Sequence, residues 1–241
     1  MSINSPPLLS AESLQIQCGE GKDQKTILNG NLACRFSLQT GQFYYLAGAS
    51  GTGKSTLLWT LARLHPLKAG ILKLNGKLST DLTVTRWRSE MALLPQKTVI
   101  FSGSVADNLL YPFTHFQIQQ KRLQERQESL PSSEQLQQEL NSLGLDDIPL
   151  EREATSLSGG QQTRLALIRV LLTKPQILLA DEPIAGLDPV ATDLVFNRLT
   201  QFCQTGGAIM LTSHVYGEQI MDSTQLVLDG QGGVQYQTKE S

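Results

Sequence analysis

The sequence has few cysteines and no surplus of positive charge. Its three cysteines, Cys18, Cys34 and Cys203, lack the spacing of a metal site or of a disulfide framework, so we expect reduced thiols. Lysine and arginine together number 20 against 22 aspartate and glutamate residues, which gives a net charge of -2. That balance predicts no basic face, and it argues against nucleic acid as a partner of the protein.

Long hydrophobic runs are also missing. The first residues, MSINSPPLLSAES, have no cationic start followed by an apolar run, so we expect no secretory signal. No segment reaches the roughly 18 apolar residues that a membrane-spanning helix needs. Hydrophobic residues still make up 40% of the 241 residues and charged residues 17%, which is typical of a soluble globular protein with a sizeable core. Any work at a membrane therefore calls for a partner that spans it.

What the chain does have is an alternation of strand-like and helix-like segments. Residues 1–10 contain two prolines and are expected to form a loose tail, and the segment 12–40 has the alternation of strands joined by turns. Further strands are predicted at 43–47, 70–77, 91–96, 177–180, 208–212 and 226–229. Helices are predicted at 55–65, 160–173 and 190–204. This order predicts an α/β fold with a mostly parallel sheet covered by helices.

The segment at about 98–156 differs from the rest of the chain. It is rich in Gln, Glu, Leu and Arg, shows no strand pattern and has a break at Pro131. Leucines such as Leu136, Leu140 and Leu143 recur at helical intervals, so we predict two or three short, largely exposed helices inserted into the fold. The alternative is a disordered Gln-rich tract.

The first motif with a chemical meaning follows the predicted strand at 43–47. It satisfies G-x-x-x-x-G-K-[ST] between a strand and a helix, which is the context that a phosphate-binding loop requires. The loop residues are Gly48, Ala49, Ser50, Gly51, Thr52, Gly53, Lys54, Ser55 and Thr56. Glycines let successive backbone N–H groups point at an anion, and the helix adds its positive N-terminal end. We expect Lys54 to bind the β- and γ-phosphates of a nucleotide and the Ser55 hydroxyl to hold Mg²⁺.

A second motif, ILLADE, places two carboxylates at the end of a predicted strand, the edge at which parallel sheets bind ligands. We expect Asp181 to reach Mg²⁺ through water, and Glu182 to point at the γ-phosphate and polarise the attacking water. An apolar run followed by Asp-Glu is by itself also typical of an ordinary strand end. The phosphate loop upstream favours the catalytic interpretation.

A third motif, Leu157-Ser158-Gly159-Gly160-Gln161, stands before this acidic pair, and with it the chain resembles an ABC transporter ATP-binding cassette, whose signature is LSGGQ. Other elements of that family follow in order. Gln96 resembles the Q-loop glutamine, Asp188 in AGLDP the D-loop aspartate, and His214 in LTSH the switch histidine. Taken alone, His214 is also typical of a surface histidine and Asp188 of a turn. The resemblance covers about residues 12–230.

The resemblance implies a P-loop NTPase in which a mostly parallel sheet is flanked by helices, with an N-terminal antiparallel β region and a helical insert. Residues 11–241 would form one ATP-binding domain that hydrolyses ATP with Mg²⁺ as cofactor. The residues that match the family's catalytic positions are Lys54, Gln96, Glu182 and His214, and those that match its metal positions are Ser55, Gln96 and Asp181.

The signature motif implies a dimer. Ser158, Gly159 and Gly160 open a predicted helix and would form a second anion cradle with Gln161. In the family, one chain does not bring both cradles to the same γ-phosphate. We therefore expect two copies, head to tail, with ATP between Lys54 of one and Ser158 of the other and with Asp188 linking the two sites.

The resemblance also implies a separate membrane-spanning permease subunit, met by the stretch FSGSVADNLLYP (101–112), and work at the cytoplasmic face of the membrane. The rival interpretation is a soluble ABC-type ATPase of DNA repair or translation, which would need long coiled coils or two cassettes in one chain. The short insert and the DNLLYP stretch are similar to the bacterial FetA (YbbL) group, implicated in export of metals, iron in particular. Polar amino acids and other small solutes stay open as alternatives.

One feature of the family is missing. Its members place an aromatic residue near the end of the first strand to stack on the adenine, but no aromatic residue lies between Leu14 and Arg35. Tyr44 and Tyr45 are expected in the core instead. ATP binding would therefore depend on the triphosphate, unless Ile27 or the partner chain covers the base.

Overall fold

Two β-sheets of different kinds make up the computed structural model, which describes residues 6–19, 24–31, 34–213 and 223–237. The first sheet is antiparallel, with the order β2-β1-β5-β6 and with β3 also paired to β1. Its strands are β1 (Leu9–Cys18), β2 (Lys25–Asn29), β3 (Phe36–Leu38), β5 (Ala69–Leu74) and β6 (Lys77–Leu78).

The second sheet is parallel except at one edge. Its order is β11-β10-β4-β9-β8-β7, and only the pair β10–β11 is antiparallel. Its strands are β4 (Phe43–Ala47), β7 (Met91–Leu94), β8 (Ile177–Asp181), β9 (Ala208–Thr212), β10 (Thr224–Leu228) and β11 (Val234–Gln237). Because β4, β8 and β9 are neighbours, the loops that follow them open at the same edge of the sheet.

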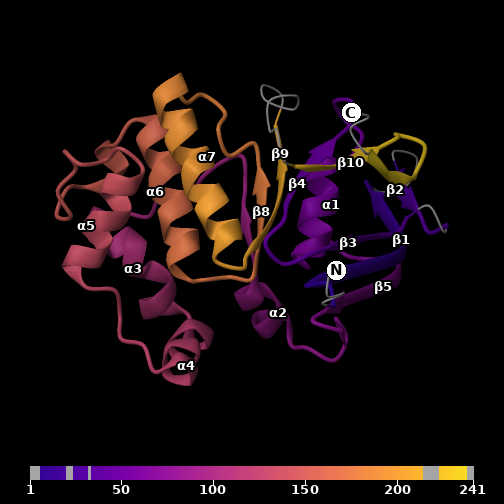
Figure 1. Cartoon of the computed structure of the whole chain (residues 1–241), viewed down its shortest axis with the longest axis horizontal. Helices are drawn as coiled ribbons and strands as arrows, with labels where there is room; N and C mark the ends of the chain where they lie inside the picture. Colours follow the sequence, from indigo (N-terminus) through magenta and orange to yellow (C-terminus); the bar gives the residue numbers. More distant parts are fainter. Residues whose placement is uncertain (1–5, 20–23, 32–33, 214–222, 238–241) are drawn as a thin grey trace.

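Helices cover the parallel sheet and extend beyond it on one side. They are α1 (Lys54–Leu61), α2 (Val84–Glu90), α3 (Val105–His115), α4 (Gln117–Arg126), α5 (Ser133–Ser142), α6 (Gly159–Leu172) and α7 (Pro189–Gln204), with a short 3₁₀ helix η2 (Ala154–Ser156). In Figure 1, α3 and α5 lie at the left, beyond α6, and α4 lies at the bottom below α6, while the antiparallel sheet lies at the right. The inserted helices are thus at the opposite end of the molecule from the N-terminal strands.

The two faces of the parallel sheet bury two separate cores. On β4, Tyr44 and Leu46 pack toward α1 and the antiparallel sheet, whereas Tyr45 packs with α6, α7 and the inserted helices. Strand β8 divides in the same way, with Leu179 in the first core and Leu178 in the second. Alternate side chains of a strand point to opposite faces, so a sheet covered on both faces needs the continuous apolar runs seen in the sequence.

The predicted fold class is confirmed: this is an α/β structure with a mostly parallel sheet, an N-terminal antiparallel region and a helical insert. Three details differ from expectation. Strand β1 begins at Leu9, so the predicted loose tail at 1–10 is too long, because Leu9 and Ser10 pair with β3 and β5. Helix α1 ends at Leu61 rather than at 65, since Arg63 has a positive φ of 58°. Strand β11 (Val234–Gln237) is not among the strands predicted from the sequence.

The segment at 98–156 is helical rather than disordered, as the leucine spacing predicts. Two of its helices begin with a reciprocal cap: Ser104 with Asp107 opens α3, and Ser132 with Gln135 opens α5. The prediction that the helices are largely exposed is wrong in part, because α3 and α5 carry residues of the second core and α4 buries Gln119 and Arg122. The fully buried members include Val105, Leu109, Leu140 and Leu143.

Candidate functional site

The loop between β4 and α1 is closed tightly by its glycines. Gly53 has a φ of 99°, and a methyl group added there would lie 2.5 Å from the side chain of Ile27. Gly48 has a φ of 146°, and the same addition would lie 2.9 Å from the Thr52 hydroxyl. Neither position suits another residue, since a side chain would be strained by the backbone and crowded by its neighbours. The loop of residues 48–56 therefore has the form expected of a phosphate cradle.

Lys54 is folded back over this loop. Its buried ammonium donates hydrogen bonds to the carbonyl of Gly48 at 2.8 Å and to that of Ala49 at 3.1 Å. An ammonium has three donors, so one is left for a phosphate oxygen. The Thr52 hydroxyl donates to the Ala49 carbonyl at 2.9 Å and tightens the same turn. Lys54 is thus held with its charge at the loop, as its predicted role requires.

The acidic pair stands at the end of β8. Asp181 is buried, and its Oδ1 accepts a hydrogen bond of 2.7 Å from the Thr212 hydroxyl on the neighbouring strand β9. Glu182 has a positive φ of 55°, a conformation that is uncommon for residues other than glycine and that recurs at functional sites. Its backbone N–H lies 3.2 Å from the Thr212 carbonyl and 3.1 Å from the Thr212 hydroxyl.

One cavity of about 640 Å³ joins the loop to the acidic pair. It is lined by Cys18, Gly19, Lys25, Ile27, Ser50, Gly51, Gly53, Lys54, Ser55, Thr56, Gln96, Asp181 and Glu182. The volume is within the usual range for ligand pockets. Predicted residues that are far apart in sequence, namely Lys54, Gln96 and Glu182, therefore face a common space.

The residues of this cavity fit a magnesium nucleotide. Ser55, Gln96 and Asp181 bring a hydroxyl, an amide and a carboxylate to it, and Mg²⁺ prefers such oxygen ligands. Within the described part of the chain, no cluster of three or more His, Cys, Asp or Glu side chains could hold a metal.

The signature motif lies outside this cavity. Ser158 is the N-cap of α6: its hydroxyl accepts from the Gln161 N–H at 3.4 Å, and the Gln161 amide oxygen accepts from the Ser158 N–H at 2.9 Å. Gly159 faces open space, since a methyl group added there would meet nothing within 4 Å, whereas at Gly160 it would lie 3.2 Å from Leu187. Neither Ser158 nor Gln161 lines the cavity of Lys54.

Two further predicted residues need separate mention. Asp188 is the N-cap of α7 and accepts a hydrogen bond of 2.9 Å from the Ala191 N–H, so it has a structural role at the turn before Pro189. His214 lies outside the described residues.

Several residues of the site escaped the sequence analysis. The Lys25 ammonium donates to the Gly51 carbonyl and so lies over the phosphate loop. Tyr45 is buried in the core as predicted, but its hydroxyl also donates to the Ser213 carbonyl at the end of β9. Burial raises the pKa of Tyr45, and the negative charge of Glu182 raises it further. A tyrosine so close to the acidic pair had no signal in the sequence beyond its place on the strand before the loop.

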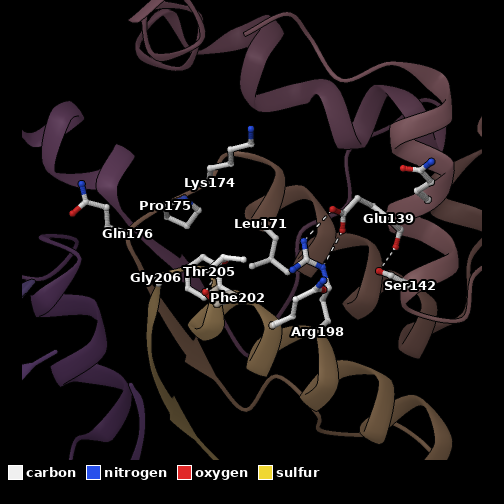
Figure 2. Close-up of a pocket in the computed structure, with 13 residues that line it drawn as sticks. Glu139, Ser142, Leu171, Lys174, Pro175, Gln176, Arg198, Phe202, Thr205 and Gly206 are labelled. Atoms are coloured by element: carbon white, nitrogen blue, oxygen red, sulfur yellow. Dashed lines mark hydrogen bonds and ion pairs between the residues drawn. The ribbon is translucent and has the colours of Figure 1, made fainter. Parts of the chain in front are cut away.

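A pocket elsewhere in the molecule provides a contrast (Figure 2). It has a volume of about 630 Å³ and lies where α5 approaches the C-terminal ends of α6 and α7. Arg198 points at Glu139 there and forms two hydrogen bonds with it, of 3.0 and 3.1 Å, and Lys174 is paired with Glu128 at 2.7 Å. Because carboxylates hold both cations, this pocket offers little positive charge to a triphosphate.

The comparisons with known proteins agree with one family. A family model described as "ABC transporter" matches residues 33–185. The lipoprotein-releasing system ATP-binding protein LolD of Nitrobacter hamburgensis is 32% identical to this chain. The match covers 86% of this chain and 87% of the length of LolD. The phosphonates import ATP-binding protein PhnC of Trichormus variabilis is 32% identical over 87% of this chain and 88% of its own length. The Nod factor export ATP-binding protein I of Ralstonia nicotianae is also 32% identical, over 90% of this chain.

This chain spans only 62% of the Nod factor export protein, and still smaller shares of some other relatives. Among solved structures, an ATP-binding subunit of an ABC transporter has a TM-score of 0.75 at 22% identity, with 96% of this chain and 90% of that chain covered. A bacterial Atm1-family exporter with ATP bound has a TM-score of 0.76 at 24% identity, over 96% of this chain and 38% of its own. These two likenesses concern the fold.

Proposed function

The chain belongs to the ABC transporter family and is one of its ATP-hydrolysing cassettes, and we propose that two copies of it power transport through a separate membrane-spanning subunit. One observation carries the proposal: the phosphate loop with Lys54 and the acidic pair Asp181-Glu182 line the same cavity, while the signature motif lies outside it. The shared cavity of Lys54 and the acidic pair supports hydrolysis at this site. The position of the signature motif outside that cavity supports a second chain as the source of the second anion cradle.

In the proposed reaction each lining residue has a limited task. The loop amides and Lys54 bind the β- and γ-phosphates, and Ser55, Gln96 and Asp181 hold Mg²⁺, which supplies charge neutralisation when bound. Glu182 accepts the proton of the attacking water as general base. His214 is proposed to assist at the γ-phosphate, as its match to the switch histidine implies.

The homodimer can be tested by mixing two defective variants. Lys54→Ala removes the loop cation and Ser158→Arg blocks the signature cradle, so each variant alone is expected to be inactive. In a head-to-tail dimer, one mixed pair combines both defects in a single site and leaves the other site intact. Random assortment at equal amounts should therefore restore about a quarter of wild-type ATPase activity, because about half of the dimers are mixed.

The matched control is a mixture of two batches of the Lys54→Ala variant, which contains no intact site at any ratio. Absence of any recovery in the Lys54→Ala and Ser158→Arg mixture, with both variants folded, would refute the shared site.

An apolar groove supports the membrane-spanning partner. A cavity of about 400 Å³ lies between α2, α3, α4 and α6, and its lining includes Leu64, Met91, Pro112, Phe116 and Ile118. Phe116 is 52% exposed and Leu64 46% exposed, although both are large apolar side chains. Exposed apolar surface of this kind is typical of interaction sites. The groove is next to the predicted contact at 101–112, which α3 brings to it through Pro112.

The stretch before α3 is held against that helix by ring stacking and hydrogen bonds. Phe101 stacks on Tyr111 with ring centroids 3.8 Å apart, and Tyr111 stacks on His115 at 3.9 Å. The Asn108 side chain accepts from the Phe101 N–H and donates to its carbonyl, both at 2.9 Å. A fixed aromatic stack beside an apolar groove suits the docking of a structured segment of a permease.

The test uses the protein encoded by the neighbouring reading frame as the membrane partner. Phe116→Asp places a charge in the groove and should abolish co-purification with the partner, while ATP hydrolysis by the isolated cassette stays as in wild type. Leu78→Asp is the matched control, since Leu78 is 39% exposed on β6, away from the groove. Equal retention of the partner by both variants would contradict the proposed contact.

No helix in the described part of the chain is long and apolar enough to cross a membrane. We propose that the cassette works at the cytoplasmic face, held there by the permease. The relatives named above include both import and export proteins, so what they share with this chain is the ATPase cassette.

For the transported substrate we propose metal export, with iron as the cargo. The proposal rests on the short insert and the DNLLYP stretch at 107–112, and polar amino acids are the competing class. Cells that lack the chain should accumulate iron, measured by elemental analysis, and wild type but not Glu182→Gln should restore the normal level. An unchanged iron content with a changed amino acid pool would favour the competing class.

A further inference from the structure

Strand β9 ends in a buried hydroxyl. Its sequence is AIMLT, in which four apolar residues are followed by Thr212, and Thr212 is only 1% exposed. A buried hydroxyl without a hydrogen bond is costly, so its partners reveal why a polar residue stands at this position.

The Thr212 hydroxyl has two partners, and both belong to the acidic pair. It donates to Asp181 Oδ1 at 2.7 Å and accepts from the Glu182 N–H at 3.1 Å. A hydroxyl can do both at once, since it has one donor and two acceptor lone pairs. Asp181 and Thr212 are also register partners of β8 and β9, so the backbone sets this contact.

These two bonds restrict the two carboxylates in different ways. The bond to Oδ1 restricts rotation of the Asp181 side chain, so Oδ2 has a defined direction. The bond to the Glu182 N–H, together with that N–H's contact of 3.2 Å to the Thr212 carbonyl, holds a residue whose φ is 55°. A positive φ at a residue with a side chain persists only where the surroundings maintain it.

The backbone that carries Thr212 is itself anchored. Tyr45 on β4 donates from its buried hydroxyl to the carbonyl of Ser213, the residue that follows Thr212. Strands β4 and β9 are paired directly before this hydrogen bond, with Tyr45 opposite Leu211. The end of β9 is therefore fixed from β4 on one side and from β8 on the other.

We propose that Thr212 is a positioning residue of the ATPase site, which orients Asp181 toward Mg²⁺ and holds the backbone of Glu182. The inference deepens the proposed function and rests on it. Hydrogen bonds to metal-binding carboxylates orient them, and loss of such a partner typically costs about 10–100-fold in metal affinity or activity. Thr212 contacts no substrate atom in this role, so its effect acts through the carboxylates.

The test compares Thr212→Val, which keeps the shape and removes the hydroxyl, with Thr212→Ser, which keeps the hydroxyl and removes a methyl group. Binding of a fluorescent ATP analogue is titrated in EDTA and then across a range of Mg²⁺ concentrations. ATP turnover is measured on the same preparations, and far-ultraviolet circular dichroism checks that both variants are folded.

For Thr212→Val we expect unchanged nucleotide affinity in EDTA, a half-saturating Mg²⁺ concentration raised about 10-fold or more, and turnover lowered by a similar factor. Thr212→Ser should stay within about threefold of wild type in both measurements, because its hydroxyl can make the same two bonds. Thr212→Val with wild-type Mg²⁺ dependence would overturn the inference, and so would an equal loss in Thr212→Ser, since packing would then be the cause.

The wild-type protein separates the two levels of the account. If it shows no effect of Mg²⁺ on nucleotide binding and no hydrolysis, the proposed function fails. If the wild type hydrolyses ATP and binds nucleotide in a Mg²⁺-dependent way, and Thr212→Val behaves like the wild type, only the role of Thr212 fails.

Discussion

Replacing Arg122 with methionine tests how the helical insert is fastened to the sheet. Arg122 on α4 is 2% exposed and lies against Glu90 at the end of α2, with 3.3 Å between guanidinium and carboxylate. It also donates to the carbonyls of Thr173 and Lys174, each at 2.9 Å. Burial lowers the pKa of Arg122 to about 10, while Glu90 opposes that effect, so the guanidinium stays charged at neutral pH.

The magnitude follows from burial rather than from distance. Arg86 approaches the same Glu90 more closely, at 3.0 Å, but its side chain is 39% exposed. Arg86 still pairs with Glu90 when Arg122 is removed, so the cost of Arg122→Met comes from the two charge-assisted hydrogen bonds to the Thr173 and Lys174 carbonyls. Such bonds contribute about 1.5–3 kcal/mol each, whereas exposed ion pairs contribute about 0.2–1 kcal/mol. A loss of about 3–6 kcal/mol in Arg122→Met should lower the melting temperature by roughly 6–24 °C, and Arg86→Met should lower it by at most a few degrees.

Scanning calorimetry on the two variants and the wild type measures this difference directly. Arg86→Met is the matched control, since it removes the same type of side chain from the same carboxylate. Equal shifts in melting temperature for both variants would refute the reasoning that burial of the arginine sets its contribution to stability. A larger shift for Arg86→Met would also refute it.

Three further predictions concern the ATP cavity. Tyr45→Phe removes the bond to the Ser213 carbonyl and should lower turnover several-fold with little change in ATP affinity; unchanged steady-state turnover would contradict it. Gly53→Ala should abolish nucleotide binding in a fluorescence titration, because the added methyl group lies 2.5 Å from Ile27 on a backbone with φ of 99°; retained binding would show that the loop can yield. No aromatic residue is among the described residues that line the cavity, so ATP and GTP should bind with similar affinity. Gly21→Tyr should tighten ATP binding several-fold, because stacking of a base on an aromatic ring contributes about 1–3 kcal/mol. A strong wild-type preference for ATP would refute the expectation of similar affinity.

The motifs located the site in the sequence because each combines a strand end with a chemical group. Parallel strands bring such ends to one edge, so Lys54 and Glu182 could be placed together from the sequence, whereas Gln96 was assigned through the resemblance to ABC cassettes. The same pattern predicted the parallel sheet. Its continuous apolar runs are required by burial on both faces.

Other features depend on contacts that no local pattern records. The role of Thr212 follows from its register opposite Asp181, and that of Tyr45 from a hydroxyl that reaches the adjacent strand. The strand β11 likewise reflects tertiary pairing, since it is polar and forms by pairing with β10. The capping roles of Ser158 and Asp188 did have a signal, because Ser followed by Gln three positions later, and Asp before Pro, are typical starts of a helix.

The most direct test of the account is the turnover of the Glu182→Gln variant, measured together with its ATP binding and its oligomeric state. Loss of the general base should cut hydrolysis by about 10²–10⁴-fold and leave ATP affinity near that of wild type. ATP should then hold two copies together, so that a dimer is seen in size-exclusion chromatography with ATP and a monomer without it. Wild-type turnover in the purified, folded variant would contradict the assignment of the site.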